Sequence, residues 1–113
     1  AAQTNTIQSG YIAESEATLV EYAIADETVA AVRNGEADAV FADRDYLKPL
    51  VDASNGELAF IGPDVPLGGG VGMGIRKSDS EMKAKFDAAI TQVKEDGTLN
   101  ALLEKWFELK GAY

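Results

Sequence analysis

Residues 34–43 read Asn-Gly-Glu-Ala-Asp-Ala-Val-Phe-Ala-Asp, so that a turn, a buried strand and a charged side chain follow one another directly. Asn34-Gly35 is typical of a helix end, because these residues readily adopt the left-handed backbone that closes a helix. Residues 38–42 form a short apolar run, which predicts a strand buried on both faces. Asp43 follows at the carboxyl end of that strand, where α/β sheets place their ligands.

Alternating strands and helices are predicted on both sides of this stretch. Three strands are expected, at residues 18–22, 38–42 and 58–61. Three helices are expected, at residues 5–14, 26–33 and 43–51, the first of them capped by Thr4 or Asn5. This order is typical of βαβ units, which build a parallel sheet with helices on both faces. The predicted fold class is therefore α/β.

The last third of the chain is predicted to be helical. Residues 78–81 read Ser-Asp-Ser-Glu, a capping box in which the serine hydroxyl and the glutamate carboxylate bond N–H groups at a helix start. Two helices, separated by Asp96-Gly97, then carry an apolar stripe. Its members are Met82, Phe86, Ile90, Val93, Leu102, Leu103, Trp106 and Phe107. Before them, residues 68–75 alternate glycine with apolar residues, which predicts an extended segment that another backbone passes closely.

Composition excludes several classes of function. The chain has 113 residues, 46% of them apolar, which is enough for the core of one domain. Its net charge of −9, from 19 acidic and 10 basic side chains, repels nucleic acid and anionic lipid. It has no cysteine and no histidine, which removes thiolate metal sites, the usual zinc ligand and the Ser-His-Asp triad. We therefore expect no nucleic-acid partner, no metal, no cofactor and no hydrolytic chemistry.

No segment of the sequence is expected to cross or target a membrane. The apolar runs are short and are interrupted by glycine or charged residues. The start, Ala1-Ala2-Gln3-Thr4, has neither the basic nor the apolar region of a signal peptide. We expect any signal peptide to lie outside these residues.

Three groups of residues together resemble a known family. They are the NGxxDAxxxD pattern of residues 34–43, then Gly72-Met73-Gly74-Ile75-Arg76-Lys77, then Asp96-Gly97-Thr98 with Lys105-Trp106-Phe107. In this order they resemble the amino-acid-binding proteins of bacterial ABC importers, and the resemblance covers essentially the whole chain. The chain is most similar to the subgroup that binds polar and basic amino acids, of the histidine and the lysine/arginine/ornithine type, including opine binders.

The resemblance implies a periplasmic protein of two α/β lobes that close on an amino acid. The membrane subunits of the transporter would then recognise the closed form. Residues 1–67 would be part of lobe two without its first strand. Residues 68–77 would cross between the lobes, and residues 78–113 would be helices that return to lobe one. The chain would thus be an incomplete lobe of a periplasmic-binding-protein-like fold plus C-terminal helices, unable to bind tightly alone.

The apolar stripe of the two C-terminal helices is too large to leave in water. In the resembling family these helices lie on lobe one, which the chain lacks. The helices could fold back on their own sheet, which would give a monomer, or they could exchange between two copies, with the glycine-rich residues 68–74 as the hinge. We expect the exchange, because these residues normally carry the chain away from its own lobe. The product would be a domain-swapped homodimer of the fragment.

Four residues are candidates for the binding site. Asp43 matches the aspartate that accepts hydrogen bonds from the ligand α-ammonium in the family; the alternative is that it simply caps the next helix. Thr4, Asn5 and Thr6 occupy a turn where the family often carries Gly-Thr-Thr and binds the α-carboxylate. In this chain Gln3 occupies the position of the family's glycine, and Asn5 occupies that of the second threonine. An equal alternative is that the turn serves only as an ordinary helix cap.

Two other classes of protein share the implied fold. One consists of enzymes, such as cyclohexadienyl-dehydratase-like proteins and peptidoglycan lyases, which need a suitably placed general acid. The other is a sensory domain in front of a kinase. The absence of histidine and the presence of Asp43 favour a binding protein over an enzyme.

Overall fold

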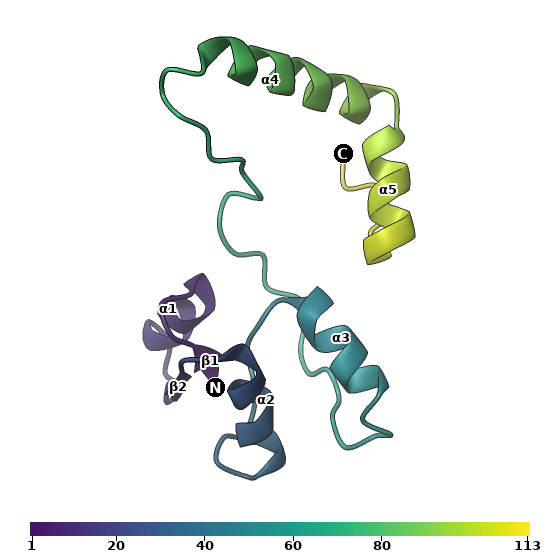
Figure 1. The fold of residues 1–113 in the computed structure, drawn as a ribbon. Coiled ribbons are helices and arrows are strands. Elements are labelled where there is room, and N and C mark those ends of the chain that lie inside the picture. The colour runs from purple at the N-terminus through teal and green to yellow at the C-terminus, as the bar shows by residue number, and fades with distance from the viewer. The chain divides into compact units, whose positions relative to one another are not determined.

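The computed structural model describes all residues from 1 to 113 and divides them into two units, Ala1–Gly70 and Val71–Tyr113 (Figure 1). The first unit contains β1 (Ala2–Gln3), α1 (Ile7–Ala13), β2 (Glu21–Tyr22), α2 (Ala25–Arg33) and α3 (Arg44–Asp52). The second unit contains α4 (Ser80–Glu95) and α5 (Thr98–Phe107). None of these helices is both long and apolar enough to cross a membrane.

The sheet is small and parallel. Strands β1 and β2 pair with Ala2 opposite Glu21 and Gln3 opposite Tyr22. Helix α2 follows β2 and contacts both strands. The parallel pairing of short strands beside helices confirms the predicted α/β class, with the sheet of an incomplete lobe.

A third segment lies beside β1 on the side away from β2. The amino group of Ala1 donates to the carbonyl of Ala39 at 2.6 Å, and Phe41 N–H donates to the carbonyl of Ala1 at 2.9 Å. These two bonds form the pattern of a parallel bridge. The chain start therefore lies between residues 20–22 and residues 39–41, and the backbone just before Asp43 is fixed to the sheet.

The predicted strands are shorter than expected or absent. Residues 18–22 contribute only the two residues of β2, and residues 38–42 form the single bridge but no regular strand. The predicted strand at residues 58–61 is wrong, because no neighbouring strand supplies hydrogen bonds to it and Ile61 is 76% exposed. A strand needs a partner, and the pattern of its own residues cannot provide one.

Helix α1 begins at a capping box, in which the hydroxyl groups of Thr6 and Ser9 each accept a hydrogen bond from the backbone N–H of the other residue. The Thr6 hydroxyl accepts a hydrogen bond from Ser9 N–H at 3.2 Å, and the Ser9 hydroxyl accepts one from Thr6 N–H at 3.3 Å. The predicted cap at Thr4 or Asn5 is therefore wrong. Asn5 instead turns the chain into the helix with a left-handed backbone, at φ 60°.

The core of the first unit is made by few side chains. Helix α2 buries Thr28, Val29 and Ala31, while β1 buries Ala2 and α3 buries Leu47. Helix α2 ends as predicted, because Gly35 takes a left-handed backbone at φ 76°.

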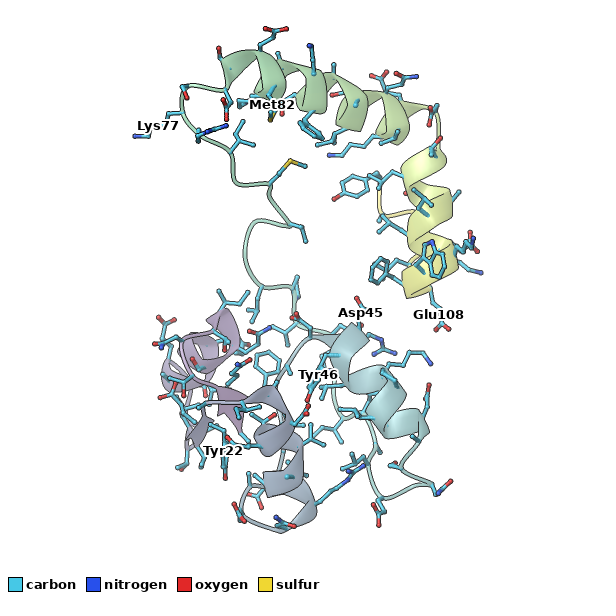
Figure 2. The ribbon with its side chains drawn as sticks, in the orientation of Figure 1. Tyr22, Asp45, Tyr46, Lys77, Met82 and Glu108 are labelled. Atoms are coloured by element: carbon cyan, nitrogen blue, oxygen red, sulfur yellow. The ribbon has the colours of Figure 1, made fainter.

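Helix α3 is tied to the start of α2 by a phenol. The hydroxyl of Tyr46 donates a hydrogen bond of 2.7 Å to Asp26 Oδ1 (Figure 2). This bond links the first turn of α3, which begins directly after Asp43, to the first turn of α2, and Leu47 is buried in the same turn of α3.

The second unit is a pair of helices in contact with each other. The predicted capping box at residues 78–81 is wrong: Asp79 occupies the cap position, and its carboxylate pairs with Arg76 at 3.0 Å instead of capping. The break at Asp96-Gly97 is confirmed, with Gly97 at φ 82°. Neither helix buries a residue, and Trp106 is 67% exposed, so the second unit by itself does not cover the predicted apolar stripe.

Candidate functional site

Asp43 stands at the start of α3 without using its side chain to cap it. Its carbonyl accepts the first hydrogen bonds of the helix, from the N–H groups of Tyr46 and Leu47, both at 3.1 Å. Its carboxylate makes no capping bond. Asp43 is thus the cap residue by backbone alone, and the negative charge of its side chain is left for a different partner.

That partner within the chain is Gln8 on α1. Gln8 Nε2 donates a hydrogen bond of 2.7 Å to Asp43 Oδ1. The carboxylate only accepts when ionised, so the amide must face it with its NH₂ group. A second contact joins the same two segments: the ring of Tyr11 on α1 lies with its centroid 5.4 Å from that of Phe41. These contacts bring Asp43 beside the start of α1, where the other three candidate residues lie.

Thr6 is committed to the fold of the turn. Its hydroxyl donates to the carbonyl of Gln3 at 2.7 Å while it accepts from Ser9 N–H. The amide of Gln3, the residue in place of the family's glycine, donates to the carbonyl of Ala23 at 3.1 Å. Both side chains therefore hold the turn against β1 and β2, and the hydroxyl of Thr6 has no donor left for a ligand.

The side chains of Thr4 and Asn5, unlike that of Thr6, are not used for hydrogen bonds within the fold. Both residues are exposed, and neither side chain makes a hydrogen bond within the chain. The Thr4 backbone is fixed to β2 by a bond of 2.9 Å from its N–H to the carbonyl of Tyr22. A hydroxyl and an amide are thus presented from a fixed backbone, and both can donate to an anion.

The guanidinium group of Arg44, the residue next to Asp43, contacts other residues and not the Asp43 carboxylate. Its guanidinium pairs with Asp64 at 3.0 Å and lies 4.6 Å from the centroid of the Phe60 ring. It therefore does not neutralise Asp43. Neither Gln8 nor Arg44 was among the residues singled out from the sequence; the only signal for Gln8 was its place in the first turn after Thr4–Thr6.

A hollow of about 300 Å³ lies elsewhere in the first unit, over the C-terminal half of α2. It is lined by Tyr22, Glu27, Ala30, Ala31, Asn34 and Glu36. The Tyr22 phenol donates to Glu36 Oε2 at 3.2 Å, and Glu27 accepts from the backbone N–H of Ile24 at 3.3 Å, so both carboxylates that line the hollow already accept a hydrogen bond. Burial, and then the bond to Glu36, raise the pKa of Tyr22. The hollow includes none of the four candidate residues.

Comparison with known proteins identifies the family of the chain. The model of the bacterial extracellular solute-binding proteins, family 3, matches residues 7–109. An L-arginine-binding protein of Pseudomonas aeruginosa is 39% identical over 65% of this chain and 30% of its own length. A histidine-binding periplasmic protein of Escherichia coli K12 is 31% identical over 80% of this chain and 37% of its own.

A lysine/arginine/ornithine-binding periplasmic protein of Escherichia coli K12 is 33% identical over 63% of this chain and 28% of its own length. The chain thus spans well under half the length of these relatives. No solved structure matches it significantly. Because the family model covers nearly all of the chain, in agreement with its parallel α/β sheet, the protein belongs to family 3 of the bacterial extracellular solute-binding proteins.

Proposed function

We propose that the chain supplies one side of the ligand site of an amino-acid-binding protein that serves an ABC importer. The observation that carries the proposal is the state of Asp43: its carboxylate does not cap α3 and does not pair with Arg44, but bonds to Gln8 in the first turn of α1, the helix that follows Thr4–Thr6. Gln8 thus links the anion of Asp43 to the helix that begins directly after the two unused donors, Thr4 and Asn5.

This arrangement suits a free amino acid, which carries an ammonium and a carboxylate on one carbon. Removing both charges from water is favourable only if each meets a fixed partner of opposite polarity. Asp43 would accept from the α-ammonium. Thr4 and Asn5 would donate to the α-carboxylate, and Thr6 would contribute by holding their turn in place.

The division of the chain fits a two-lobed protein. We assign residues 1–67 to the lobe that carries Asp43, residues 68–77 to the crossing between lobes and residues 78–113 to helices that return to the other lobe. The apolar stripe of α4 and α5 supports this assignment, since helices with a large apolar face need a surface to cover it, and the second unit alone does not provide one.

The ligand class follows from the relatives, which are named for arginine, for lysine, arginine and ornithine, and for histidine. We infer a basic or polar amino acid, with opines, which keep an amino-acid end, inside the same class. The partners would be that ligand and the membrane subunits of the importer, and the location would be the periplasm, as the names of two relatives state for those proteins.

A binding protein differs from an enzyme of the same fold in that it releases its ligand chemically unchanged. The test is calorimetry of the full-length protein with L-arginine, L-lysine, L-histidine and the opine octopine, followed by chromatography of the recovered ligand. We expect at least one to bind and to be recovered unchanged. Chemical conversion of the ligand, or no binding of any of the four, would refute the proposal.

For the isolated chain we propose a second partner, another copy of itself. The second unit does not cover the apolar stripe of α4 and α5, and Gly68 and Gly70 before it adopt left-handed backbone conformations, at φ 72° and 103°. A hinge there would let the helices of one copy pack on the first unit of the other.

A further inference from the structure

Gln8 is the one side chain of the first unit that bonds directly to the carboxylate of Asp43. The two residues lie 35 positions apart in the sequence, on different helices, and their side chains meet at 2.7 Å. Gln8 is half-buried on α1, and the tilted contact between the rings of Tyr11 and Phe41 holds that helix against the segment before Asp43. The bond is therefore supported on both sides by fixed backbone.

The bond restricts what the carboxylate can do. Asp43 makes no capping bond, so without Gln8 no hydrogen bond within the chain would select one rotamer of its side chain. With Oδ1 held by the amide, the carboxylate plane is set and Oδ2 is left as an acceptor. A group held in advance loses less conformational entropy when a ligand binds.

The neutral amide also preserves the charge of the site. A lysine or arginine at position 8 would neutralise Asp43 and compete with a ligand ammonium, while a glutamate would repel the carboxylate. Glutamine donates a hydrogen bond and leaves the full negative charge on Asp43. Such a partner suits a carboxylate that must receive a cation from outside the chain.

We infer that Gln8 is a positioning residue: it holds Asp43 Oδ1 so that Oδ2 meets the α-ammonium of the bound amino acid. This inference rests on the proposed function. The inference adds to that function a residue that determines how the ammonium is recognised but does not itself need to touch the ligand.

The test uses the full-length protein and two variants, Gln8→Met, which keeps the side-chain volume without the donor, and Gln8→Glu, which keeps the shape but repels Asp43. Calorimetry compares L-arginine with 5-guanidinopentanoate, which lacks only the α-ammonium, and likewise L-lysine with 6-aminohexanoate. Each variant should bind the amino acid about tenfold or more weakly, the usual effect of losing a hydrogen bond to a charged group. Binding of the analogue without the ammonium should change by less than about threefold.

A double-mutant cycle separates positioning from a general effect on the fold. In an Asp43→Asn background, Gln8→Met should weaken binding by less than about threefold further, because its effect passes through the aspartate. Equal weakening of the amino acid and its analogue, or a full effect in the Asp43→Asn background, would overturn the role of Gln8. Unchanged amino-acid affinity in both Gln8 variants would do so as well. If the wild type binds neither L-arginine, L-lysine nor L-histidine, the proposed function itself fails and the role of Gln8 falls with it.

Discussion

The phenol of Tyr46 on α3 donates a hydrogen bond of 2.7 Å to Asp26 Oδ1 at the start of α2. Burial, and then the bond to Asp26 and the charge of its carboxylate, raise the pKa of Tyr46 to about 12. The folded chain therefore holds the phenolic proton more tightly than the unfolded chain does. The stability from this bond is fully present below pH 10 and is lost as the pH rises from 10 to about 12.

Replacing Tyr46 by phenylalanine should reveal this dependence. At pH 7 Tyr46→Phe should lower the free energy of unfolding by about 1 kcal/mol, the usual net value of such a hydrogen bond. Urea denaturation at pH 9, 10 and 11 should show wild type losing stability more steeply than the variant. Tyr11→Phe is the matched control, since the Tyr11 hydroxyl makes no hydrogen bond in the chain. An equally steep loss in Tyr46→Phe would contradict the assignment.

Thr6 and Thr4 differ in whether their hydroxyls are used by the fold. Thr6→Ala removes both hydrogen bonds of its hydroxyl and should cost about 0.5–2 kcal/mol, as the loss of a helix cap does. Thr4→Ala should change the free energy of unfolding by less than about 0.5 kcal/mol, because its exposed hydroxyl has no partner. Thermal or urea denaturation checks both values. The distinction fails if Thr4→Ala costs as much as Thr6→Ala, or if Thr6→Ser does not restore the loss.

Local signals in the sequence predicted the helices of this chain well, and pairing between distant segments was not predictable. Asn34-Gly35 ends α2 as expected, since a left-handed glycine is a property of the turn itself. Residues 58–61 have an apolar pattern like a strand but find no strand to pair with. Their pattern carried no information about a neighbour.

The same reason limits what could be predicted of the site. Asp43 follows an apolar run and was named from the sequence, but its bond to Gln8 joins residues 35 positions apart and has no local signature. The cap expected at Ser78 fails because Asp79 takes the cap position and Arg76 takes its carboxylate, a competition the capping pattern does not include.

Asp43→Asn in the full-length protein should weaken binding of the cognate amino acid strongly. Losing one partner of a desolvated charge pair costs about 2–5 kcal/mol, or about 30- to 5,000-fold in affinity. Asp45→Asn is the matched control, because Asp45 lies two residues away on α3, is exposed and has no ion pair. Calorimetry of wild type and both variants decides the assignment. A change under about threefold for Asp43→Asn would remove Asp43 from the site.

The 113-residue chain by itself should not bind amino acids tightly. A site with one side open leaves the ligand in water, where ion pairs contribute little. Calorimetry with L-arginine, L-lysine and L-histidine should show no heat at sub-millimolar concentrations, while the full-length protein binds at least one of them. Micromolar binding by the chain alone would mean that this lobe forms the whole site.

The oligomeric state of the isolated chain depends on its uncovered apolar stripe. Burying a large apolar side chain contributes about 1.5–3 kcal/mol, so covering several of them is large beside a domain stability of about 5–15 kcal/mol. Met82 and Trp106 belong to this stripe and are exposed, on α4 and α5 respectively. A second copy that covers the stripe would therefore be strongly favoured.

Light scattering after size exclusion should accordingly find a dimer, about twice the 12.0 kDa of one chain, at micromolar concentration. Met82→Lys with Trp106→Lys should shift it to the monomer, because each places a charge on the stripe. Lys85→Ala is the matched control, since Lys85 is exposed and pairs with Glu81 within α4. A shorter hinge, with Gly69 and Gly70 deleted, should favour the exchanged dimer further, because it hinders the helices from folding back on their own first unit, whereas a dimer of helices that merely associate face to face would not depend on the hinge length. A wild-type chain that stays monomeric across micromolar concentrations would refute the exchange.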